Sequence, residues 1–491
     1  MDDLENLSDR LSRGAVTTDP ATVAERARDL SPLALLRVAR GDSQGAARAV
    51  IFPRSTEEVS TVLGWAADTG TPVVPRGAGS GVVGGVAASE GTVILDLSHM
   101  DQVMSVDDLS RVVHTQAGIR GDRLEAELEA HGLTLGHYPQ SIDISTVGGW
   151  IAASSAGQAS TGYGAIEDLL IGATVVLAGG EIVRLHPVPR SAAGPDLRRL
   201  VVGSEGTLCV VTEAFLACSP RPRGYVWEGF GFESFENCMA AMREVVRAHV
   251  QPAIVRGYDE ADAALAFGPI VHAGGSVAII GFSNSGPGLD ERRRVSRERL
   301  AANGGKDLGG GYGEHWFEHR NDATKLYRQI MGRERLFGPG LVVDTMEVAG
   351  LWRDVPKIYR EVRARLAEQA QAVGCHLSHL YETGSSLYFT FLIRGIDDRD
   401  AEARYGRAWE EAVRACLKAG GTMTHHHGVG RLKVPFLAEE LGENGVGVLR
   451  RIKQALDPQG LLNPGVLLPT VLEPDGPSWL PGFDERERRR R

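Results

Sequence analysis

The sequence predicts an α+β protein made of two unlike parts, and three observations predict this fold class. From about Ala46 to Cys218, short β-branched runs alternate with glycine-rich turns and brief helical patterns. Residues 220–440 instead alternate strand-like runs with long amphipathic helices, which favours an α/β arrangement with one sheet covered by helices on one face. We expect this to be an antiparallel sheet. A length of 491 residues is also long for a single core.

The elements divide the chain into five predicted segments. Residues 1–45 look helical and polar, with Pro20 and Pro32 as breaks. The two large segments are 46–219 and 220–440. A C-terminal segment, 441–470, contains a last helix in VGVLRRIKQALDP and the turn GLLNPGVL. The remaining residues, 471–491, are rich in Pro, Gly and charge, and we expect them to be disordered.

Composition excludes several classes of function. The net charge of -10 disfavours a nucleic-acid partner. Five scattered cysteines without CxxC spacing argue against a disulfide framework or a zinc site and fit a reducing compartment. No apolar run is long enough for a transmembrane span, and MDDLENLSDR is not a signal peptide, so we expect a cytoplasmic protein. The basic tail ERERRRR leaves peripheral contact with an anionic membrane surface open.

Two glycine-rich loops indicate a dinucleotide site. Gly79, Gly81 and Gly84 match GxGxxG, but GVAASEG leaves no room for the helix of a parallel crossover before the next strand. We therefore expect a direct strand-to-strand loop that presents backbone N–H groups to an anion. Residues 136–169 form a second loop dense in small residues. Such loops suit a flat or phosphorylated ligand held between two subdomains.

A histidine triplet, His425, His426 and His427, precedes Gly428. Imidazoles can hold or release a proton near neutral pH, and glycine allows close approach of another group. Consecutive residues of a strand point to opposite faces, so we predict that the triplet is not a metal site. The alternative is one buried histidine beside two solvated ones.

On these motifs the chain resembles the vanillyl-alcohol-oxidase family of flavoproteins over roughly residues 45–468. The resemblance rests on PVVPRGAGSGVVGG, GHYPQSIDISTVGGW with YGAIEDL, GSEGTLCVVTEA and LDPQGLLNPGVL. It implies a two-subdomain, PCMH-type FAD-binding domain, a substrate (cap) domain, and a C-terminal segment that returns to the FAD domain. The residues implied to bind FAD are Pro75, Arg76, Gly77, Ala78, Gly79, Ser80, Gly81, Pro139, Ser141, Ser145, Thr146, Gly148, Gly149, Ser154, Gly157, Tyr163, Gly164, Glu205, Gly206, Val211 and Asn463.

The first loop lacks a histidine and the second lacks a cysteine, which are the family's usual places for a covalent flavin link. We therefore expect non-covalent FAD. A covalent link through a histidine of the substrate domain remains an alternative.

Within the family, PAIVRGYD, SHLYETGSSLYF and THHHGVGRLK most resemble alkyldihydroxyacetonephosphate synthase. That branch exchanges an acyl for an alkyl group through a flavin N5 adduct, without net redox, in ether lipid biosynthesis. The resemblance implies a phosphorylated or lipid-like small-molecule substrate and a homodimer. It makes Tyr381 the acid/base, His425 to His427 the polar cluster, and Arg256 the cation for the phosphate. A tyrosine serves as base only where its pKa is lowered.

Departures from related branches keep other readings open. HLYETG stands where 2-hydroxy-acid dehydrogenases carry a metal-binding HxGDGN motif, and His426–His427 replaces their Glu-His pair. An oxidase or dehydrogenase that passes a hydride to flavin N5 is the alternative, and an inactive flavin-binding protein is another. Arg256 could form a salt bridge to Asp259 or Glu347. The stretch after Trp316, with Arg320 in a W-x3-R spacing, is expected to shape the substrate mouth.

Overall fold

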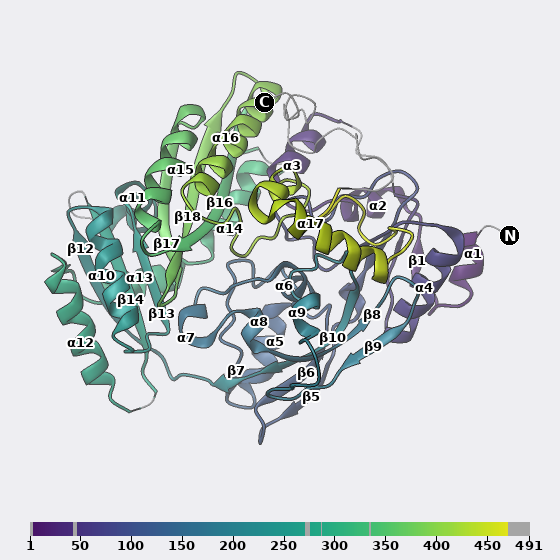
Figure 1. The fold of residues 1–491 in the computed structure, drawn as a ribbon, viewed down its shortest axis with the longest axis horizontal. Helices are drawn as coiled ribbons and strands as arrows, with labels where there is room; N and C mark the ends of the chain where they lie inside the picture. The colour runs from purple at the N-terminus through teal and green to yellow at the C-terminus, as the bar shows by residue number, and fades with distance from the viewer. Residues whose placement is uncertain (1–2, 43–46, 271–274, 286, 333–334, 470–491) are drawn as a thin grey trace.

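The computed structural model describes residues 3–42, 47–270, 275–285, 287–332 and 335–469. It contains two parts, a first domain with a four-stranded and a five-stranded sheet, and a second domain with a seven-stranded sheet (Figure 1). The predicted tail 471–491 lies outside the described residues.

The four-stranded sheet carries the first glycine loop. Its order is β1 (Val16–Thr17), β2 (Ala49–Ile51), β4 (Val93–Asp96) and β3 (Val73–Arg76). The loop after β3 runs directly to β4 without a helix, as predicted, but β3 and β4 pair in parallel. The premise that a parallel pair needs a helical crossover is therefore wrong here, because an irregular loop of sufficient length closes it.

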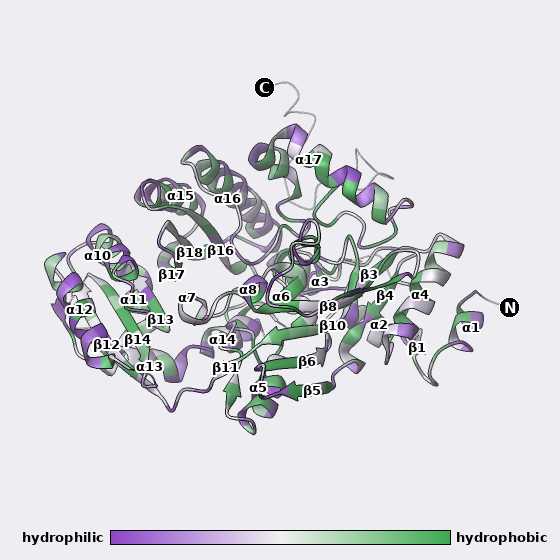
Figure 2. Cartoon of the chain, turned by 60° about the horizontal axis from the view of Figure 1, so that its bottom comes forward, coloured by the Kyte–Doolittle hydropathy of each residue, from purple (hydrophilic) through white to green (hydrophobic). Residues whose placement is uncertain are grey.

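The five-stranded sheet of the first domain is antiparallel throughout. Its order is β5 (Val103–Asp107), β6 (Val112–Gln116), β10 (Val210–Ala217), β8 (Leu170–Val176) and β9 (Ile182–Leu185). Strands β6 and β10 are predominantly hydrophobic (Figure 2), and they pack on α5 and α6 in one core. A two-stranded ribbon, β7 (Leu133–Thr134) with β11 (Ser219–Pro220), lies beside the sheet.

Short helices connect the strands of the first domain. Pro20 and Pro32, predicted as breaks, are the first residues of two separate helices, where their missing N–H is not needed. The helices are α1 (Asp3–Ser8), α2 (Pro20–Arg26), α3 (Pro32–Ala39), α4 (Thr56–Thr69), α5 (Gly121–Glu129), α6 (Val147–Ala153), α7 (Ser160–Tyr163), α8 (Ile166–Leu169) and α9 (Arg198–Val201).

The second domain contains the predicted antiparallel sheet. Its order is β15 (Lys306–Asp307), β12 (Tyr225–Phe232), β14 (Ser276–Ser283), β13 (Ile254–Tyr258), β17 (Ala372–Leu380), β18 (Gly384–Arg394) and β16 (Leu341–Leu351), and every pairing is antiparallel. Its helices are α10 (Phe235–Arg247), α11 (Glu260–Phe267), α12 (Leu289–Ala302), α13 (Gly311–His319), α14 (Asp322–Met331), α15 (Val355–Gln369) and α16 (Asp398–Lys418).

The two faces of this sheet have different surroundings. Helices α10, α15 and α16 cover one face and share its largest hydrophobic core (Figure 1). Because side chains alternate along a strand, Val255 joins that core while Ile254, Arg256 and Tyr258 face the other way. This second face meets α11, α13 and residues of the second glycine loop. Strand alternation thus directs Arg256 toward the first domain.

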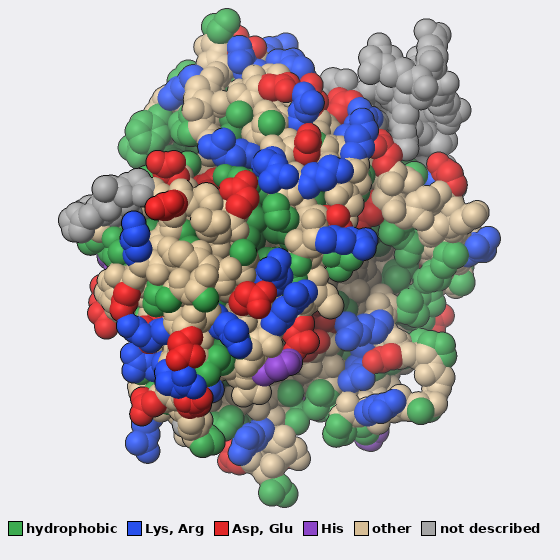
Figure 3. Space-filling view, turned by 60° about the vertical axis from the view of Figure 1, so that its left-hand side comes forward, with side chains coloured by type: hydrophobic (Ala, Val, Ile, Leu, Met, Phe, Trp, Pro, Cys, Tyr) green, Lys and Arg blue, Asp and Glu red, His purple; other side chains and the backbone are tan. Residues whose placement is uncertain are grey.

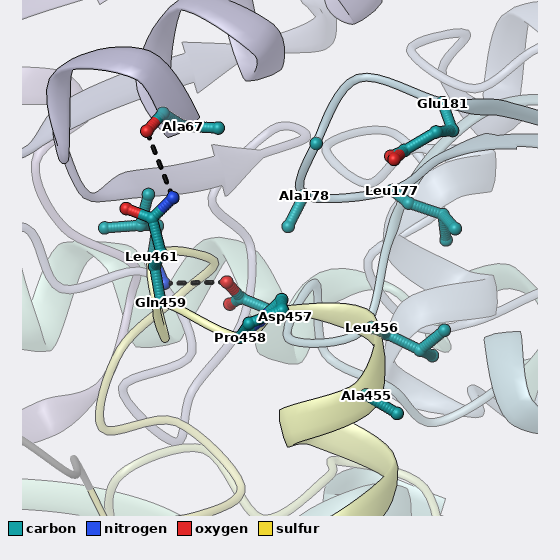
Figure 4. A pocket seen from close by; sticks show the side chains of 11 residues that line it. Ala67, Leu177, Ala178, Glu181, Ala455, Leu456, Asp457, Pro458, Gln459 and Leu461 are labelled. Carbon is teal, nitrogen blue, oxygen red and sulfur yellow. Dashed lines mark hydrogen bonds between the residues drawn. The ribbon is translucent and has the colours of Figure 1, made fainter.

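The C-terminal segment returns to the first domain. Helix α17 (Leu437–Leu456) begins before the predicted VGVLRRIKQALDP and has a kink at Gly442. Leu462 then forms a bridge with Val73 of β3. A pocket of about 290 Å³ marks this seam, where the Gln459 amide donates to the Ala67 carbonyl (Figure 4). It contains none of the candidate site residues.

The surface charges, the cysteines and the helices add three findings. On the face in Figure 3, basic and acidic side chains are interspersed. The arginine run of α12 follows the same pattern, with Arg294 paired to Glu291 and Glu298. All five cysteines are free. Among the described residues, no helix combines the length and apolar character that crossing a membrane requires.

Candidate functional site

The first glycine loop is built on a buried ion pair. Arg76 ends β3 and its Nη1 donates to Asp96 at 2.8 Å and to the Gly77 carbonyl, while its Nη2 donates to the Ala78 carbonyl. A Cβ on Gly79, whose φ is +70°, would lie 2.5 Å from the Arg76 guanidinium. Arg76 thus shapes the loop from beneath rather than offering a free cation.

The loop suits an anionic ligand. With the carbonyls of Gly77 and Ala78 turned to Arg76, the N–H groups of Ala78, Gly79 and Ser80 donate to no other group in the described part of the chain. Several adjacent free N–H groups form an anion-binding concavity. They fit the pyrophosphate of FAD, the group implied by the sequence.

The second loop lies against the first. A Cβ on Gly77 would approach Thr146 Oγ1 to 2.3 Å, so only glycine allows this contact. Thr146 caps α6 by accepting the N–H of Gly149, and Gly148 packs on Ala117. Ser145 is held between the Ser141 carbonyl and Trp150 Nε1, both at 2.8 Å. The predicted residues 75–81 and 141–149 are therefore neighbours.

The C-terminal segment completes this region. Asn463 Nδ2 donates to the carbonyls of Gly85 and Glu205, while its buried Oδ1 has no hydrogen-bond partner among the described residues. Gly206 packs on Pro75. A buried amide oxygen without a partner is costly and suits a ligand donor. Asn463 and Glu205 are thus joined to the first loop, as the motifs implied.

Other predicted cofactor residues have visible structural contacts. Gly157 lies against the Tyr138 backbone, Tyr163 packs over Gly136, and Val211 lies in the core of the five-stranded sheet. Ser154 adopts a left-handed conformation beside Glu167. Pro139 accepts the N–H of Ile142, and Gly164, with a φ of +90°, follows α7.

The histidine triplet lies in an irregular loop and not in a strand. The strand-based reason for excluding a metal site is therefore wrong. The loop is anchored by Glu347 of β16, a fully buried carboxylate. Its Oε1 accepts the N–H groups of His425 and His427 at 3.3 and 2.9 Å and the Thr424 hydroxyl at a short distance. One carboxylate thus sets the path of the loop.

Glu347 is ionised in this setting. Burial alone would raise its pKa, but His427 and Lys433 outweigh burial and hold the Glu347 pKa well below its usual range. Lys433 Nζ lies 3.0 and 3.2 Å from the two carboxylate oxygens and is itself fully buried. His427 Nδ1 lies 3.1 Å from Oε2.

A second carboxylate, Glu205, ties the loop to the first domain. It accepts the N–H groups of Val429 and Gly430, both at 2.7 Å. Burial raises the Glu205 pKa to about 7, against the lowering effect of these two donors. Gly430 is required because a Cβ there would lie 2.1 Å from the Val83 carbonyl oxygen.

Tyr381 and His425 are joined by a direct hydrogen bond. The Tyr381 hydroxyl lies 2.8 Å from His425 Nε2, and His425 Nδ1 lies 3.0 Å from His426 Nδ1. Although 41% of Tyr381 is exposed, burial of its hydroxyl end, together with Glu167 and Asp168, raises its pKa. Burial also lowers the His425 pKa to about 4. Tyr381 is therefore the donor and His425 the neutral acceptor.

His379 completes a group of three imidazoles. Its ring stacks on His425 with centroids 5.0 Å apart, and Ser160 Oγ lies 2.6 Å from its Nδ1. One nitrogen each of His379, His425 and His426 lies within 4.8 Å of the others, a spacing that could hold a metal. However, stacked rings have parallel rather than convergent lone pairs, and both His425 nitrogens are already engaged. Proton handling suits the arrangement better than metal binding.

Arg256 forms neither salt bridge that was considered, to Asp259 or to Glu347. Its Nη2 lies 2.6 Å from His376 Nε2, and within the part of the chain that the structure describes its buried Nε has no hydrogen-bond partner. The guanidinium carbon lies 5.1 Å from the Trp316 ring centroid. Arg256 also lowers the His379 pKa, after burial and the other histidines, which places its charge beside the cluster.

The stretch after Trp316 borders the second glycine loop. The Arg320 carbonyl accepts the side-chain amides of Gln140 and Gln158 at 3.4 and 3.3 Å. The guanidinium of Arg320 stacks on Phe317 at 3.9 Å. These contacts position residues 316–320 at the junction of the two domains.

Comparison with known proteins decides the family. Residues 47–186 match the model of an FAD binding domain, and residues 221–467 match that of the C-terminal domain of FAD linked oxidases. The chain belongs to the FAD-linked oxidase family. As a member it is 29% identical over 472 residues to alkyldihydroxyacetonephosphate synthase of Dictyostelium discoideum, covering 89% of this chain and 76% of that protein.

Two further similarities are to an FAD-linked oxidoreductase and to a solved synthase structure. An uncharacterized FAD-linked oxidoreductase, YgcU of Escherichia coli (strain K12), is 31% identical over 442 residues, covering 86% of this chain and 89% of its own. A solved structure of alkyldihydroxyacetonephosphate synthase has a TM-score of 0.79 at 25% identity, covering 94% of this chain and 85% of that one.

Sequence reasoning missed several residues of this FAD-linked oxidase site. Glu347 was considered only as a partner of Arg256, and its place inside the apolar run LVVDTMEV was a visible sign of a buried role. His376 and His379 lie among apolar neighbours in one strand, and this pattern was a second sign of buried polar residues. Nothing in the local sequence marked Lys433. The predicted Tyr381, Arg256 and histidine triplet do converge.

Proposed function

We propose that this FAD-linked oxidase family member exchanges the acyl group of an acylated, phosphorylated hydroxyketone for an alkyl group, without net redox. In this reaction the bond between the substrate carbon and the oxygen of the fatty acyloxy group breaks, and the fatty acid leaves as a carboxylate. A fatty alcohol loses its proton and forms the new carbon–oxygen bond. Bound FAD, held non-covalently, supplies the electron-accepting ring that makes the substrate carbon reactive.

The observation that carries the proposal is the Tyr381–His425 hydrogen bond of 2.8 Å beside an arginine without a carboxylate partner. Tyr381 carries a proton and His425 Nε2 accepts its hydrogen bond, so the pair can pass a proton between a reacting group and the imidazole. Arg256 offers a fixed charge to a phosphate. His426 and His427 provide polar contacts for a departing carboxylate.

The runner-up is oxidation of an alcohol or 2-hydroxy acid with hydride transfer to FAD, which the similarity to an FAD-linked oxidoreductase favours. Against it, the chain has His426–His427 in place of a Glu-His pair. Arg256 would equally suit a carboxylate, so the cation alone does not separate the two reactions. A third candidate, an inactive flavin-binding protein, leaves the Tyr381–His425 contact without a purpose.

One anaerobic experiment separates these functions. The FAD-loaded protein is mixed with acyl-dihydroxyacetone phosphate and a fatty alcohol, or with 2-hydroxy acids and alcohols in turn. We expect an ether product while the flavin absorbance stays oxidised. Bleaching by a hydroxy acid without ether product would contradict the proposal and support the runner-up. Absence of any reaction with a full complement of FAD would support the inactive binder.

A further inference from the structure

Arg256 is a buried charge held in an unusual way. A buried guanidinium is costly and is normally neutralised by a carboxylate. Arg256 is 7% exposed, yet among the described residues it forms no salt bridge. Its Nη2 instead donates to the imidazole of His376 at 2.6 Å, and the guanidinium also contacts the neutral Tyr258 side chain. Its positive charge is therefore not cancelled by a direct neighbour.

The chemistry of the contact fixes the state of His376. A guanidinium has only donors, so His376 Nε2 must accept. The proton of a neutral imidazole then sits on Nδ1, which lies 2.6 Å from Asp262 Oδ2 and donates to it. Burial and Arg256 both lower the His376 pKa, which keeps the ring neutral.

Helix α11 fixes the position of Asp262. Asp259 caps α11 and accepts the N–H of Asp262 at 2.8 Å, so Asp262 lies in the first turn of that helix. A helix N-terminus stabilises a negative charge. Asp262 is 5% exposed and lies one imidazole away from Arg256, where it sets the tautomer of His376.

The face of Arg256 away from His376 lies at the candidate site. Its Nε is buried and no described residue accepts a hydrogen bond from it, and the Arg256 charge lowers the pKa values of His379 and Tyr388, opposing burial at Tyr388. The His376 ring stacks on Tyr388 at 4.8 Å, and Tyr388 stacks on His426 at 5.9 Å. The relay formed by Arg256, His376 and Asp262 therefore lines the same wall of the site as the histidine cluster.

A β-bulge makes this shared wall possible. His376 and His379 are an odd number of residues apart in β17, so a regular strand would direct them to opposite faces. The pairing of β17 with β18 shifts register between Leu377 and Leu380, a segment that follows His376 and contains His379. Such a bulge re-aims side chains.

We infer that His376 and Asp262 are positioning residues that hold Arg256 as an uncancelled cation for the phosphate of the substrate. The inference deepens the proposed function and rests on it for the identity of the substrate. Asp262 fixes the tautomer of His376, and His376 fixes the plane of the guanidinium. A carboxylate in place of His376 would neutralise the positive charge of Arg256, which then could not attract the phosphate of the substrate.

The test measures binding of inorganic phosphate to the FAD-loaded protein by calorimetry at constant ionic strength, without turnover. We expect His376→Leu to weaken phosphate binding roughly 10-fold or more, as removal of a supporting partner commonly does. Asp262→Asn should weaken it too, because the amide can stabilise the wrong tautomer. His376→Gln should restore binding, since its oxygen can accept from Arg256 while its N–H donates to Asp262.

The control is Arg363→Gln, which removes a neighbouring cation that pairs with Asp259 and leaves the relay intact. It should bind phosphate as the parent protein does. FAD content and Tm report folding, and Asp262→Asn serves if His376→Leu fails to fold. Equal phosphate affinity in Asp262→Asn or His376→Leu and the parent, or no binding by the parent, would overturn the inference. Because no turnover is measured, an absence of ether synthesis would refute only the proposed function.

Discussion

At the scale of single residues, protonation states decide what the site can do. Tyr381 has a raised pKa and His425 a lowered one, so their contact joins a donor to a neutral acceptor. The sequence-based requirement that cations lower the Tyr381 pKa is not met by these surroundings, since burial and Glu167 raise it. A tyrosinate is therefore not the resting form, and proton transfer must be coupled to His425.

Tyr381→Phe tests this coupling. The variant keeps the ring and removes the donor, so we expect turnover to fall about 100-fold or more, the usual size of a lost acid–base group. FAD content should stay unchanged. The measurement is single-turnover product formation with bound FAD quantified in parallel. Parent-like turnover of the variant would remove Tyr381 from the mechanism.

Glu205 predicts a pH dependence of stability. Its folded pKa of about 7 lies above the ordinary glutamate value of 4.5, so the native state binds the proton more tightly than the unfolded chain. This contribution is complete below about pH 4.5 and is lost as the pH rises through 7. Glu205→Gln, which keeps an acceptor for Val429 or Gly430, should flatten this part of the profile. Urea unfolding at several pH values between 4.5 and 8 measures it, and an unchanged slope would contradict the assignment.

At the scale of elements, the glycine loops and the histidine loop depend on different kinds of support. The first loop is shaped locally, by Arg76 at the end of β3 and by glycine φ values. The histidine loop is shaped by Glu347 from β16 and Glu205 from the first domain. The first kind of support is visible in a short motif. The second joins residues far apart in the chain.

Gly79→Ala tests the first loop. Its φ of +70° strains any side chain, and the new Cβ would press on Arg76 at 2.5 Å. We expect loss of bound FAD, measured as the ratio of flavin to protein absorbance after purification. Gly91→Ala is the matched control, because its φ is +83° but its Cβ would meet nothing within 4 Å. The control should cost about 1–2 kcal/mol of stability and retain FAD.

At the scale of the whole molecule, the site is assembled where the two domains meet. The seven-stranded sheet turns one face to helices α10, α15 and α16 and the other to the first domain. Ser160 of α7 contacts His379 of β17, and Val83 accepts the N–H groups of Arg431 and Leu432. Neither domain holds the candidate site alone. An intact candidate site therefore requires that the two domains pack against each other.

Lys433→Met tests this assembly. Removing Lys433 leaves Glu347 buried without its cation, which commonly costs about 3–5 kcal/mol. We expect a large fall in Tm together with weaker FAD retention, measured by thermal unfolding followed by flavin fluorescence. Arg294→Gln, which breaks an exposed ion pair on α12, is the control and should change Tm little. Equal shifts in the two variants would mean that the Lys433–Glu347 pair has no special role.

The sequence by itself determined the parts that depend on local chemistry. Glycine spacing indicated the cofactor loops, periodicity indicated a sheet covered by helices, residue type marked the histidine triplet, and the resemblance to a flavoprotein family implied Tyr381 and Arg256. Only the tertiary structure decided that Glu347 anchors the histidine loop and that His376 faces Arg256. The physical reason is that these contacts join segments far apart in the chain. The position of His379 depends in addition on a β-bulge. A register shift of one residue reverses which face a side chain occupies, and no local pattern encodes it.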